Sequence, residues 1–284
     1  MARTVYVNGE YLSEHEAKIS IFDRSFLMAD GVYEVTSVLD GKLVDYEGHR
    51  ARLHRSLSEL EMDPPVDDDE LLRVHRSLVE RNDLDEGVVY LQVTRGEAER
   101  DFAYPKDPKP GLVMFTQEKA LAETEAARRG IRVVTEPDLR WGRPDIKTVQ
   151  LLYPSMAKMA AKKRGADDAW MVLDDGTVSE GTSNTAYIVR DGVIVTRHLG
   201  TEILPGITRA SVLALAREAQ MRVEERPFTV AEAKEADEAF VTAASAFVLP
   251  VIEIDGATIG EGTPGPVSRR LREIYVETAR REAI

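Results

Sequence analysis

A lysine, a glutamate, two arginines and a glycine-threonine pair are the residues of this sequence that could carry chemistry. Lys147 lies in a loop after an Arg-Trp-Gly-Arg-Pro stretch, and a lysine amine can form a covalent bond to a carbonyl compound. Glu180 stands between two apolar stretches and could accept a hydrogen bond from a cationic heterocycle nitrogen. Gly206-Ile207-Thr208 precedes a predicted helix, whose first amides and Thr208 hydroxyl could bind a phosphate.

The two arginines could bind anions. Arg52 lies on a predicted helix and could clamp a phosphate, and Arg100 lies in an acidic loop and could bind a carboxylate through its fork of donors. Each candidate also has an ordinary explanation. Arg52 fits a solvated helix face beside His49 and Arg55, and Arg100 fits a surface ion pair. No single position decides between the two explanations.

The composition is that of a globular enzyme. Of 284 residues, 43% are hydrophobic and 31% are charged, and the formal net charge is 37 − 50 = −13. Such an acidic chain lacks the broad basic surface that nucleic acids or anionic membranes require. With no cysteine and five histidines that show no ligand spacing, we expect no disulfide and no metal site. Without an apolar leader or a membrane-length run, we expect a cytoplasmic protein.

Strand signals outnumber helix signals, and hairpin turns dominate over regular strand–helix–strand alternation. The pattern predicts an α+β fold with a more barrel-like second half. The helices are expected at about 47–61, 70–82, 154–164, 209–220, 230–235 and 267–281. In the helix at 154–164, we expect Met156, Met159 and Ala160 on the inner face. A polar stretch predicts a small N-terminal domain over 1–118, a linker over 119–126 and a large domain over 127–284.

Seven stretches follow one another in a familiar order. They are Phe22-Asp23-Arg24 with Asp30-Gly31-Val32-Tyr33-Glu34, His49-x-x-Arg52-Leu53, Gln92-Val93-Thr94-Arg95-Gly96, Asp145-Ile146-Lys147, Glu180-Gly181-Thr182-Ser183-Asn184, Gly206-Ile207-Thr208-Arg209 and Pro250-Val251-Ile252-Glu253-Ile254-Asp255-Gly256. On these stretches the chain resembles the class IV aminotransferases that use pyridoxal phosphate, and among them the D-amino-acid aminotransferases most closely. The resemblance runs nearly end to end.

The resemblance implies a fold type IV enzyme with a small N-terminal α/β domain and a larger barrel-like, cofactor-binding domain, the cofactor lying between the two, and usually a homodimer. It makes Lys147 the Schiff-base lysine, which also moves a proton at the substrate. It implies that Glu180 binds the pyridine nitrogen of the cofactor and keeps it protonated, and that Leu204 packs against the cofactor ring. The remaining roles that it implies are phosphate binding by Arg52, Gly206, Ile207, Thr208, Ala243 and Ala244, and substrate binding by Tyr33, Val35, Arg100 and Phe102.

Two departures from the family pattern bear on the substrate and the cofactor. The D-amino-acid enzymes carry an arginine and a histidine, two positions apart, on the loop that binds the substrate carboxylate. Here the pair is Arg100 and Phe102, so one donor is lost and the pocket is more apolar. Family members often have a threonine at the position of Ala244, so we expect weaker phosphate binding.

The implied reaction moves an amino group from a D-amino acid to a 2-oxo acid such as 2-oxoglutarate or pyruvate. Phe102 leaves open an (R)-selective amine transaminase. The shared fold and cofactor also leave open a 4-amino-4-deoxychorismate lyase. A branched-chain L-amino-acid transaminase is less expected, because the Tyr-x-x-Arg carboxylate pattern of that group is not evident.

Overall fold

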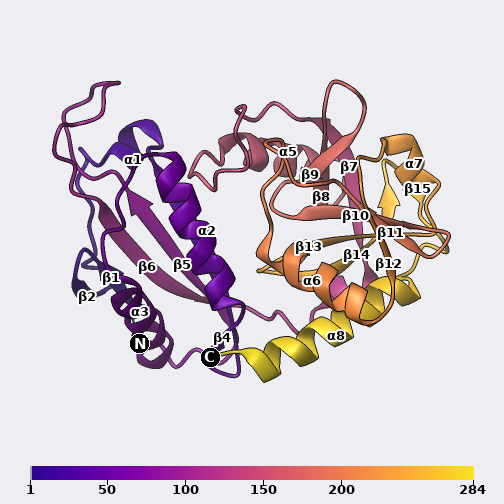
Figure 1. The fold of residues 1–284 in the computed structure, drawn as a ribbon, viewed down its shortest axis with the longest axis horizontal. Coiled ribbons are helices and arrows are strands. Elements are labelled where there is room, and N and C mark those ends of the chain that lie inside the picture. The colour runs from indigo at the N-terminus through magenta and orange to yellow at the C-terminus, as the bar shows by residue number, and fades with distance from the viewer. Residues whose placement is uncertain (1) are drawn as a thin grey trace. The chain divides into compact units, whose positions relative to one another are not determined.

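The computed structural model describes residues 2–284, and its chain forms two compact units (Figure 1). Unit 1 holds the chain up to Ala120 together with Ile146–Gln150 and Ala279–Ile284, and unit 2 holds Leu121–Asp145 and Leu151–Thr278. The short segment that carries Lys147 therefore packs with the N-terminal part of the chain. The division into 1–118, 119–126 and 127–284 remains a prediction.

Unit 1 is built on a six-stranded antiparallel sheet in the order β2-β1-β6-β5-β3-β4. Its strands are β1 (Thr4–Val7), β2 (Glu10–Ser13), β3 (Gly31–Leu39), β4 (Lys42–Leu43), β5 (Gly87–Thr94) and β6 (Gly111–Glu118). The predicted Asn8-Gly9 hairpin turn is present, and both residues have positive φ, 48° and 101°, as two-residue hairpins require.

Three helices accompany this sheet: α1 (Arg24–Met28), α2 (Tyr46–Glu59) and α3 (Asp68–Arg81). Figure 1 shows α2 and α3 beside the sheet, where α2 packs on β3 and α3 packs on β1, β5 and β6. Asp67 caps α3 by accepting the Glu70 N–H at 2.8 Å, and Leu71, Val74 and Leu78 form its buried stripe. The cap and the helical spacing of apolar residues explain why this segment is a helix.

Unit 2 contains a curled nine-stranded mixed sheet in the order β12-β11-β10-β13-β14-β7-β8-β9, with β15 paired to β14. Its strands are β7 (Ile131–Pro137), β8 (Asp168–Val172), β9 (Val178–Gly181), β10 (Thr185–Arg190), β11 (Val193–Thr196), β12 (Arg222–Glu225), β13 (Glu238–Ala243), β14 (Phe247–Ile254) and β15 (Ala257–Thr258). Edge strand β9 also contacts β10, so the sheet curls back on itself. The α+β fold with a barrel-like second half is confirmed.

The helices of unit 2 are α4 (Glu125–Arg129), α5 (Leu152–Lys163), α6 (Ile207–Glu218), α7 (Val230–Lys234) and most of α8 (Pro266–Glu282), whose residues from Ala279 onward belong to unit 1. Two of them connect parallel neighbours, since α5 joins β7 to β8 and α6 joins β11 to β12. Strand–helix–strand units therefore occur here beside the hairpins that dominate the sequence pattern. Within residues 2–284, no helix is long and apolar enough to cross a membrane.

The inner face predicted for α5 is wrong. Met156 and Met159 are 57% and 55% exposed, whereas Pro154, Ala157 and Ala161 are buried. The alanines pack in a small cluster with residues of β7 and β8, and their size lets the helix backbone come close to the sheet. Both stripes are apolar, so helical periodicity alone could not choose between them.

Candidate active site

Lys147 is held by its backbone against β3 and α2. Its carbonyl accepts the Tyr33 N–H at 3.0 Å, and its own N–H donates to the Ser56 hydroxyl at 3.3 Å. The following residue Thr148 forms a β-bridge with Val32. The segment thus extends the free part of the β3 edge beyond the short strand β4, which fixes the point from which the Lys147 side chain starts.

The amine of Lys147 lies over an aromatic ring. Its Nζ is 4.1 Å from the centre of the Tyr33 ring, within the range of a cation–π contact. Tyr33 stacks on Tyr90 at 5.7 Å, and Tyr90 stacks on Phe115 at 4.7 Å. Val35 is half-buried and points to the same side as Tyr33, because alternate strand residues share a face. The amine of Lys147 therefore lies beside a partly exposed row of aromatic and apolar side chains.

The opposite face of β3 holds a buried charged cluster around Arg52. Arg52 donates from Nε and Nη2 to the two oxygens of Glu34, both at 2.8 Å. His49 Nδ1 lies 2.8 Å from the same carboxylate. Burial alone would raise the pKa of Glu34, but the Arg52 charge and the hydrogen bonds from Arg52 and His49 hold that pKa well below its usual value. Sequence reasoning missed this partner of the predicted phosphate clamp, although Glu34 lies in a matched stretch.

Glu180 lies on β9 with its carboxylate buried, 5% exposed. Arg140 donates to it from Nη1, and the Leu204 N–H lies 3.3 and 3.4 Å from its two oxygens. Arg140 also forms a fork with Asp138, with Nε–Oδ1 at 2.9 Å and Nη2–Oδ2 at 2.7 Å. Leu204, expected against the cofactor ring, is thus tied to Glu180 through its backbone. Sequence reasoning missed Arg140, whose only signal is its place shortly before Lys147.

Burial and the neighbouring Arg140 act in opposite directions on the pKa of Glu180. Burial raises the pKa of Glu180, and the charge and hydrogen bond of Arg140 counteract that rise. The pKa of Arg140 is itself raised despite burial, because Asp138 and Glu180 stabilise its charge. A buried carboxylate that is costly to ionise suits a site where a further cationic donor binds.

The start of α6 leaves polar groups without partners. Gly206 is the N-cap, and no side chain caps the first turn. A Cβ on Gly206 would lie 3.0 Å from the Thr185 hydroxyl, so glycine keeps this approach open. Thr208 is 3% exposed, and its hydroxyl has no hydrogen-bond partner within residues 2–284. A buried hydroxyl without a partner costs roughly 1–3 kcal/mol, which a bound anion would relieve.

Ala243 and Ala244 lie at the same edge of unit 2 as this helix start. Ala243 ends β13, and Ala244 follows in the turn to β14. The neighbouring Thr242 is paired with Thr185 of β10, and the Thr185 hydroxyl is the nearest atom to a Cβ built on Gly206, at 3.0 Å. Four of the residues predicted for the phosphate, those at 206–208 and 243, therefore gather near one end of β10 and β13.

Arg100 and Phe102 lie on the exposed loop between β5 and β6. Phe102 is 81% exposed, and the Arg100 guanidinium carbon lies 5.7 Å from its ring centre. In the described part of the chain, no hydrogen bond, ion pair or ring contact joins either residue to Lys147 or Tyr33. In the single chain, these two predicted substrate residues are therefore exposed to solvent.

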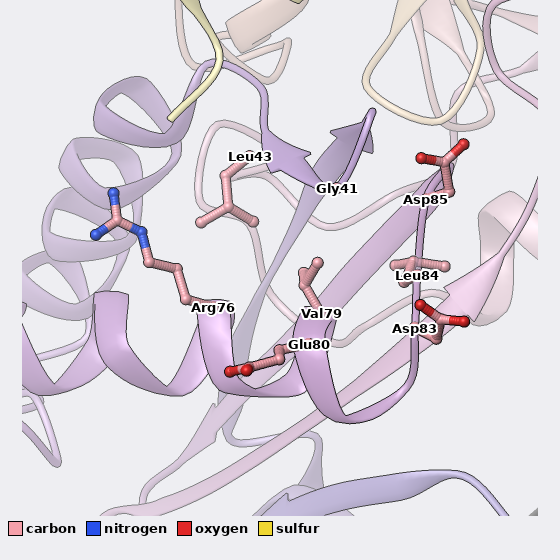
Figure 2. A pocket seen from close by; sticks show the side chains of 8 residues that line it. All are labelled: Gly41, Leu43, Arg76, Val79, Glu80, Asp83, Leu84 and Asp85. Atoms are coloured by element: carbon pink, nitrogen blue, oxygen red, sulfur yellow. The ribbon is translucent and has the colours of Figure 1, made fainter.

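A hollow of about 420 Å³ in unit 1 is lined by none of the predicted site residues. Figure 2 shows its lining, which comes from α3, the β3–β4 turn, β4 and the segment before β5, namely Gly41, Leu43, Arg76, Val79, Glu80, Asp83, Leu84 and Asp85. Across residues 2–284, no group of three or more histidine, aspartate or glutamate side chains is arranged to hold a metal ion. The catalytic role of Lys147 and the cofactor-binding role of Glu180 remain predictions.

Comparison with known proteins identifies the family. The family model described as amino-transferase class IV matches residues 31–254. A D-alanine aminotransferase from Bacillus licheniformis is 39% identical over 281 residues, which is 97% of this chain and 99% of the relative. A second, from Staphylococcus aureus (strain N315), is 38% identical over 270 residues, 95% of each chain.

A solved structure supports the same conclusion at the level of the fold. The branched-chain amino acid aminotransferase from T.th., complexed with N-(5'-phosphopyridoxyl)-L-glutamate, is similar with a TM-score of 0.87 and 28% identity, covering 98% of this chain and 94% of that one. The resemblance inferred from the seven stretches is confirmed, because the match extends over almost the whole chain. This chain belongs to the class IV aminotransferases.

Proposed function

We propose that this protein is a pyridoxal-phosphate-dependent transaminase that moves an amino group between a D-amino acid, such as D-alanine or D-glutamate, and a 2-oxo acid, such as 2-oxoglutarate or pyruvate. The support for the substrate class is its similarity, at 38–39% identity, to relatives named D-alanine aminotransferase. The observation that carries the cofactor is the buried Thr208 hydroxyl, unpaired within residues 2–284, at the uncapped start of α6.

The residues fit a phosphorylated pyridine cofactor. The α6 amides and Thr208 would bind the phosphate, with Arg52 as a further cation. Glu180 would accept the ring N–H, and Arg140 would keep that carboxylate ionised. When bound, pyridoxal phosphate supplies a carbonyl that takes up amines and a ring that withdraws electrons.

Lys147 has two tasks in this proposal. Its amine would hold the cofactor covalently, and when free the same amine would take a proton from the substrate Cα. Tyr33, whose ring already lies against the Nζ at 4.1 Å, would line the pocket with Val35. Arg100 would bind the substrate carboxylate as a fork, and Phe102 would give that part of the pocket an apolar wall.

The protein is further proposed to be a cytoplasmic homodimer with domains over 1–118 and 127–284. Support for a dimer comes from large apolar side chains exposed on one part of unit 1. Ile21, Phe22 and Phe26 are 68%, 46% and 67% exposed, and Phe102 is 81% exposed. The Phe22 carbonyl accepts a hydrogen bond from the Ala98 N–H, which belongs to the loop that carries Phe102. Such a patch marks a contact surface. Light scattering after gel filtration should give twice the chain mass of 31.6 kDa.

The function is tested by mixing the holoenzyme with D-alanine, L-leucine or (R)-1-phenylethylamine and following the absorbance of the bound cofactor. Fast conversion to the pyridoxamine form with D-alanine is expected. A response to (R)-1-phenylethylamine alone would instead identify an amine transaminase, which the apolar Phe102 would suit. A response to L-leucine alone would point to branched-chain L-amino acids, and release of pyruvate from aminodeoxychorismate would point to the lyase.

The role of Arg100 is tested separately. Replacing Arg100 with Ala should reduce kcat/KM for D-alanine by about a hundredfold or more, because a charge-assisted fork to the carboxylate is lost. Turnover of D-alaninamide, which lacks the carboxylate charge, should change little. Equal losses with both compounds would remove the carboxylate role from Arg100.

A further inference from the structure

We propose that Arg24, Asp30 and Arg95 form a buried charged cluster that positions the loop carrying Arg100, and that Arg24 is thereby a positioning residue for carboxylate specificity. This inference rests on the proposed role of Arg100. The three residues belong to stretches shared with the family, Phe22-Asp23-Arg24, Asp30-Gly31 and Thr94-Arg95-Gly96, yet neither the cofactor nor the substrate chemistry above uses them.

The cluster is a carboxylate between two guanidinium groups. Asp30 Oδ2 accepts from Arg24 Nε at 2.7 Å and from Arg95 Nε at 2.8 Å. The side chains of Arg24, Asp30 and Arg95 are 3%, 10% and 2% exposed. Two cations facing one anion out of water are expensive unless their other donors are used, so the destinations of those donors show what the cluster does.

Arg95 uses its remaining donors on the end of α2. Nη2 donates to the Leu60 carbonyl at 2.7 Å and Nη1 to the Glu61 carbonyl at 3.2 Å. These carbonyls lie at the C-terminal end of the helix, where a positive charge also interacts favourably with the helix dipole. Arg95 therefore ties the cluster to the helix that carries Arg52.

Arg24 uses its Nη1 donor on the substrate loop. Its Nη1 donates to the Asp101 carbonyl at 2.7 Å and lies 3.4 Å from the Ala103 carbonyl, the residues on either side of Phe102. The loop also closes over the cluster, because the Tyr104 ring centre lies 3.6 Å from the Arg95 guanidinium carbon. In the described chain, the hydrogen bonds and ring contacts that join residues 99–104 to the rest of unit 1 all end on these two arginines.

The stem of the loop is fixed next to the same cluster. The Arg24 N–H donates to the Gly96 carbonyl at 2.9 Å, and the Ala98 N–H donates to the Phe22 carbonyl at 3.1 Å. Gly96 has φ +93°, and a Cβ there would lie 2.0 Å from the Lys109 carbonyl oxygen. Only glycine permits this closure of the two ends of the loop.

Arg100 consequently sits on a short span between two fixed points, the backbone bond at Ala98 and the Asp101 carbonyl held by Arg24. Within residues 2–284 its own guanidinium makes no hydrogen bond or ion pair, and its ring contact is with Phe102 of the same loop. The direction in which Arg100 points is thus set by Arg24 rather than by direct packing. A shift of about 1 Å in a binding group can cost about a hundredfold in rate, so a loosened loop should weaken recognition of the carboxylate selectively.

The experiment compares Arg24→Lys with Arg100→Ala and with Arg3→Lys in the holoenzyme. Lysine keeps a charge beside Asp30 but loses the fork that also reaches the loop. Arg3 is the matched control, because it likewise donates to a carbonyl, that of Thr116 at 2.7 Å, and to a carboxylate, that of Glu14 at 2.9 Å, away from the loop. For each variant, kcat and KM are measured with D-alanine and D-alaninamide, and amide hydrogen exchange is measured over residues 97–104.

Arg24→Lys should lower kcat/KM for D-alanine about ten- to a hundredfold, chiefly through KM, while D-alaninamide turnover stays within about twofold. Exchange over 97–104 should quicken in Arg24→Lys and not in Arg3→Lys or Arg100→Ala. Equal losses with both substrates, or unchanged selectivity for D-alanine, would overturn the inference. If Arg100→Ala loses selectivity and Arg24→Lys does not, the inference fails while the proposed function stands. If Arg24→Lys loses selectivity for D-alanine and Arg100→Ala keeps it, Arg100 does not bind the carboxylate.

A second variant covers the case in which Arg24→Lys does not fold. Tyr104→Leu removes the ring over Arg95 from a side chain that is 52% exposed, so the buried cluster stays intact. Exchange over 97–104 should rise, and kcat/KM for D-alanine should fall severalfold relative to D-alaninamide. Unchanged exchange and unchanged selectivity in this variant would also count against the proposed cluster.

Discussion

Replacing Glu34 with Gln should destabilise unit 1 strongly while hardly changing the side-chain volume. Glu34 is 3% exposed and accepts three hydrogen bonds, two from Arg52 and one from His49, all at 2.8 Å. A glutamine must place its amide nitrogen where one of these oxygens now lies, so that nitrogen faces at least one Arg52 donor. The substitution also leaves the Arg52 charge buried beside a neutral group.

The magnitude follows from those contacts. Removing one partner of a buried ion pair costs about 3–5 kcal/mol, and two charge-assisted hydrogen bonds at roughly 1.5–3 kcal/mol each give a similar figure. Because the pKa of Glu34 lies below its ordinary value of 4.5, the ionised form stabilises the fold above about pH 4.5, and this contribution is lost as pH falls through the lower folded pKa. The difference between the two proteins should therefore be constant from about pH 5.5 to 8 and should shrink in acid.

Hydrogen exchange of the α2 amides in urea is the suitable assay. Both tryptophans, Trp141 and Trp170, lie in unit 2, so their fluorescence would not report directly on Glu34. Glu14→Gln is the control, because Glu14 forms a comparable pair with Arg3 near the surface and should leave the free energy of unfolding nearly unchanged. The reasoning is refuted if Glu34→Gln costs no more than this control, or if the difference grows below pH 4.5.

Four further outcomes are expected. Borohydride reduction with pyridoxal phosphate should add mass to the peptide containing Lys147, and Lys147→Ala should gain none by mass spectrometry; labelling of another lysine would reassign the role. Thr208→Val should leave the cofactor-free protein as stable or about 1 kcal/mol more stable, yet weaken cofactor binding about tenfold, which calorimetry with and without cofactor would separate; equal affinity would exclude Thr208 from the phosphate site. Ala244→Thr should slow cofactor loss during gel filtration, and unchanged loss would place the phosphate elsewhere. Glu180→Gln should lower kcat about a hundredfold. Because burial raises the pKa of Glu180, the pH profile of wild-type turnover should fall in acid, and the profile of this variant should lack that fall. The same fall in both proteins would point to a different group.

Local patterns predicted most elements but not their partners. The Asn8-Gly9 turn and the stripe of α3 follow from rules that act over a few residues, and they appear where expected. The inner face of α5 failed, because choosing between an alanine stripe and a methionine stripe requires knowing how close β8 approaches. That distance is a property of the tertiary packing.

The same limit applies to the site. Lys147 and Glu180 could be singled out from residue type, order and resemblance, and their roles remain predictions. The partners of Arg52 and Glu180, namely Glu34 and Arg140, could not be singled out. Nothing in the spacing of Glu34 and Arg52 says that a strand and a helix bring them together. An ion pair between segments distant in the sequence leaves no periodic pattern. A buried ion pair is recognised only when the burial of both side chains is known.

Strand β3 shows why the register of unit 1 matters for chemistry. Tyr33 faces Lys147, and the next residue, Glu34, faces Arg52 on the opposite side. Since successive strand residues point to opposite faces, a shift of one residue would turn Glu34 to the face of the lysine and Tyr33 to the charged face. Gly31 at the start of the strand restricts such a shift, because a Cβ there would lie 2.8 Å from the Val93 carbonyl oxygen. The close pairing with β5 thus keeps the aromatic face and the charged face apart.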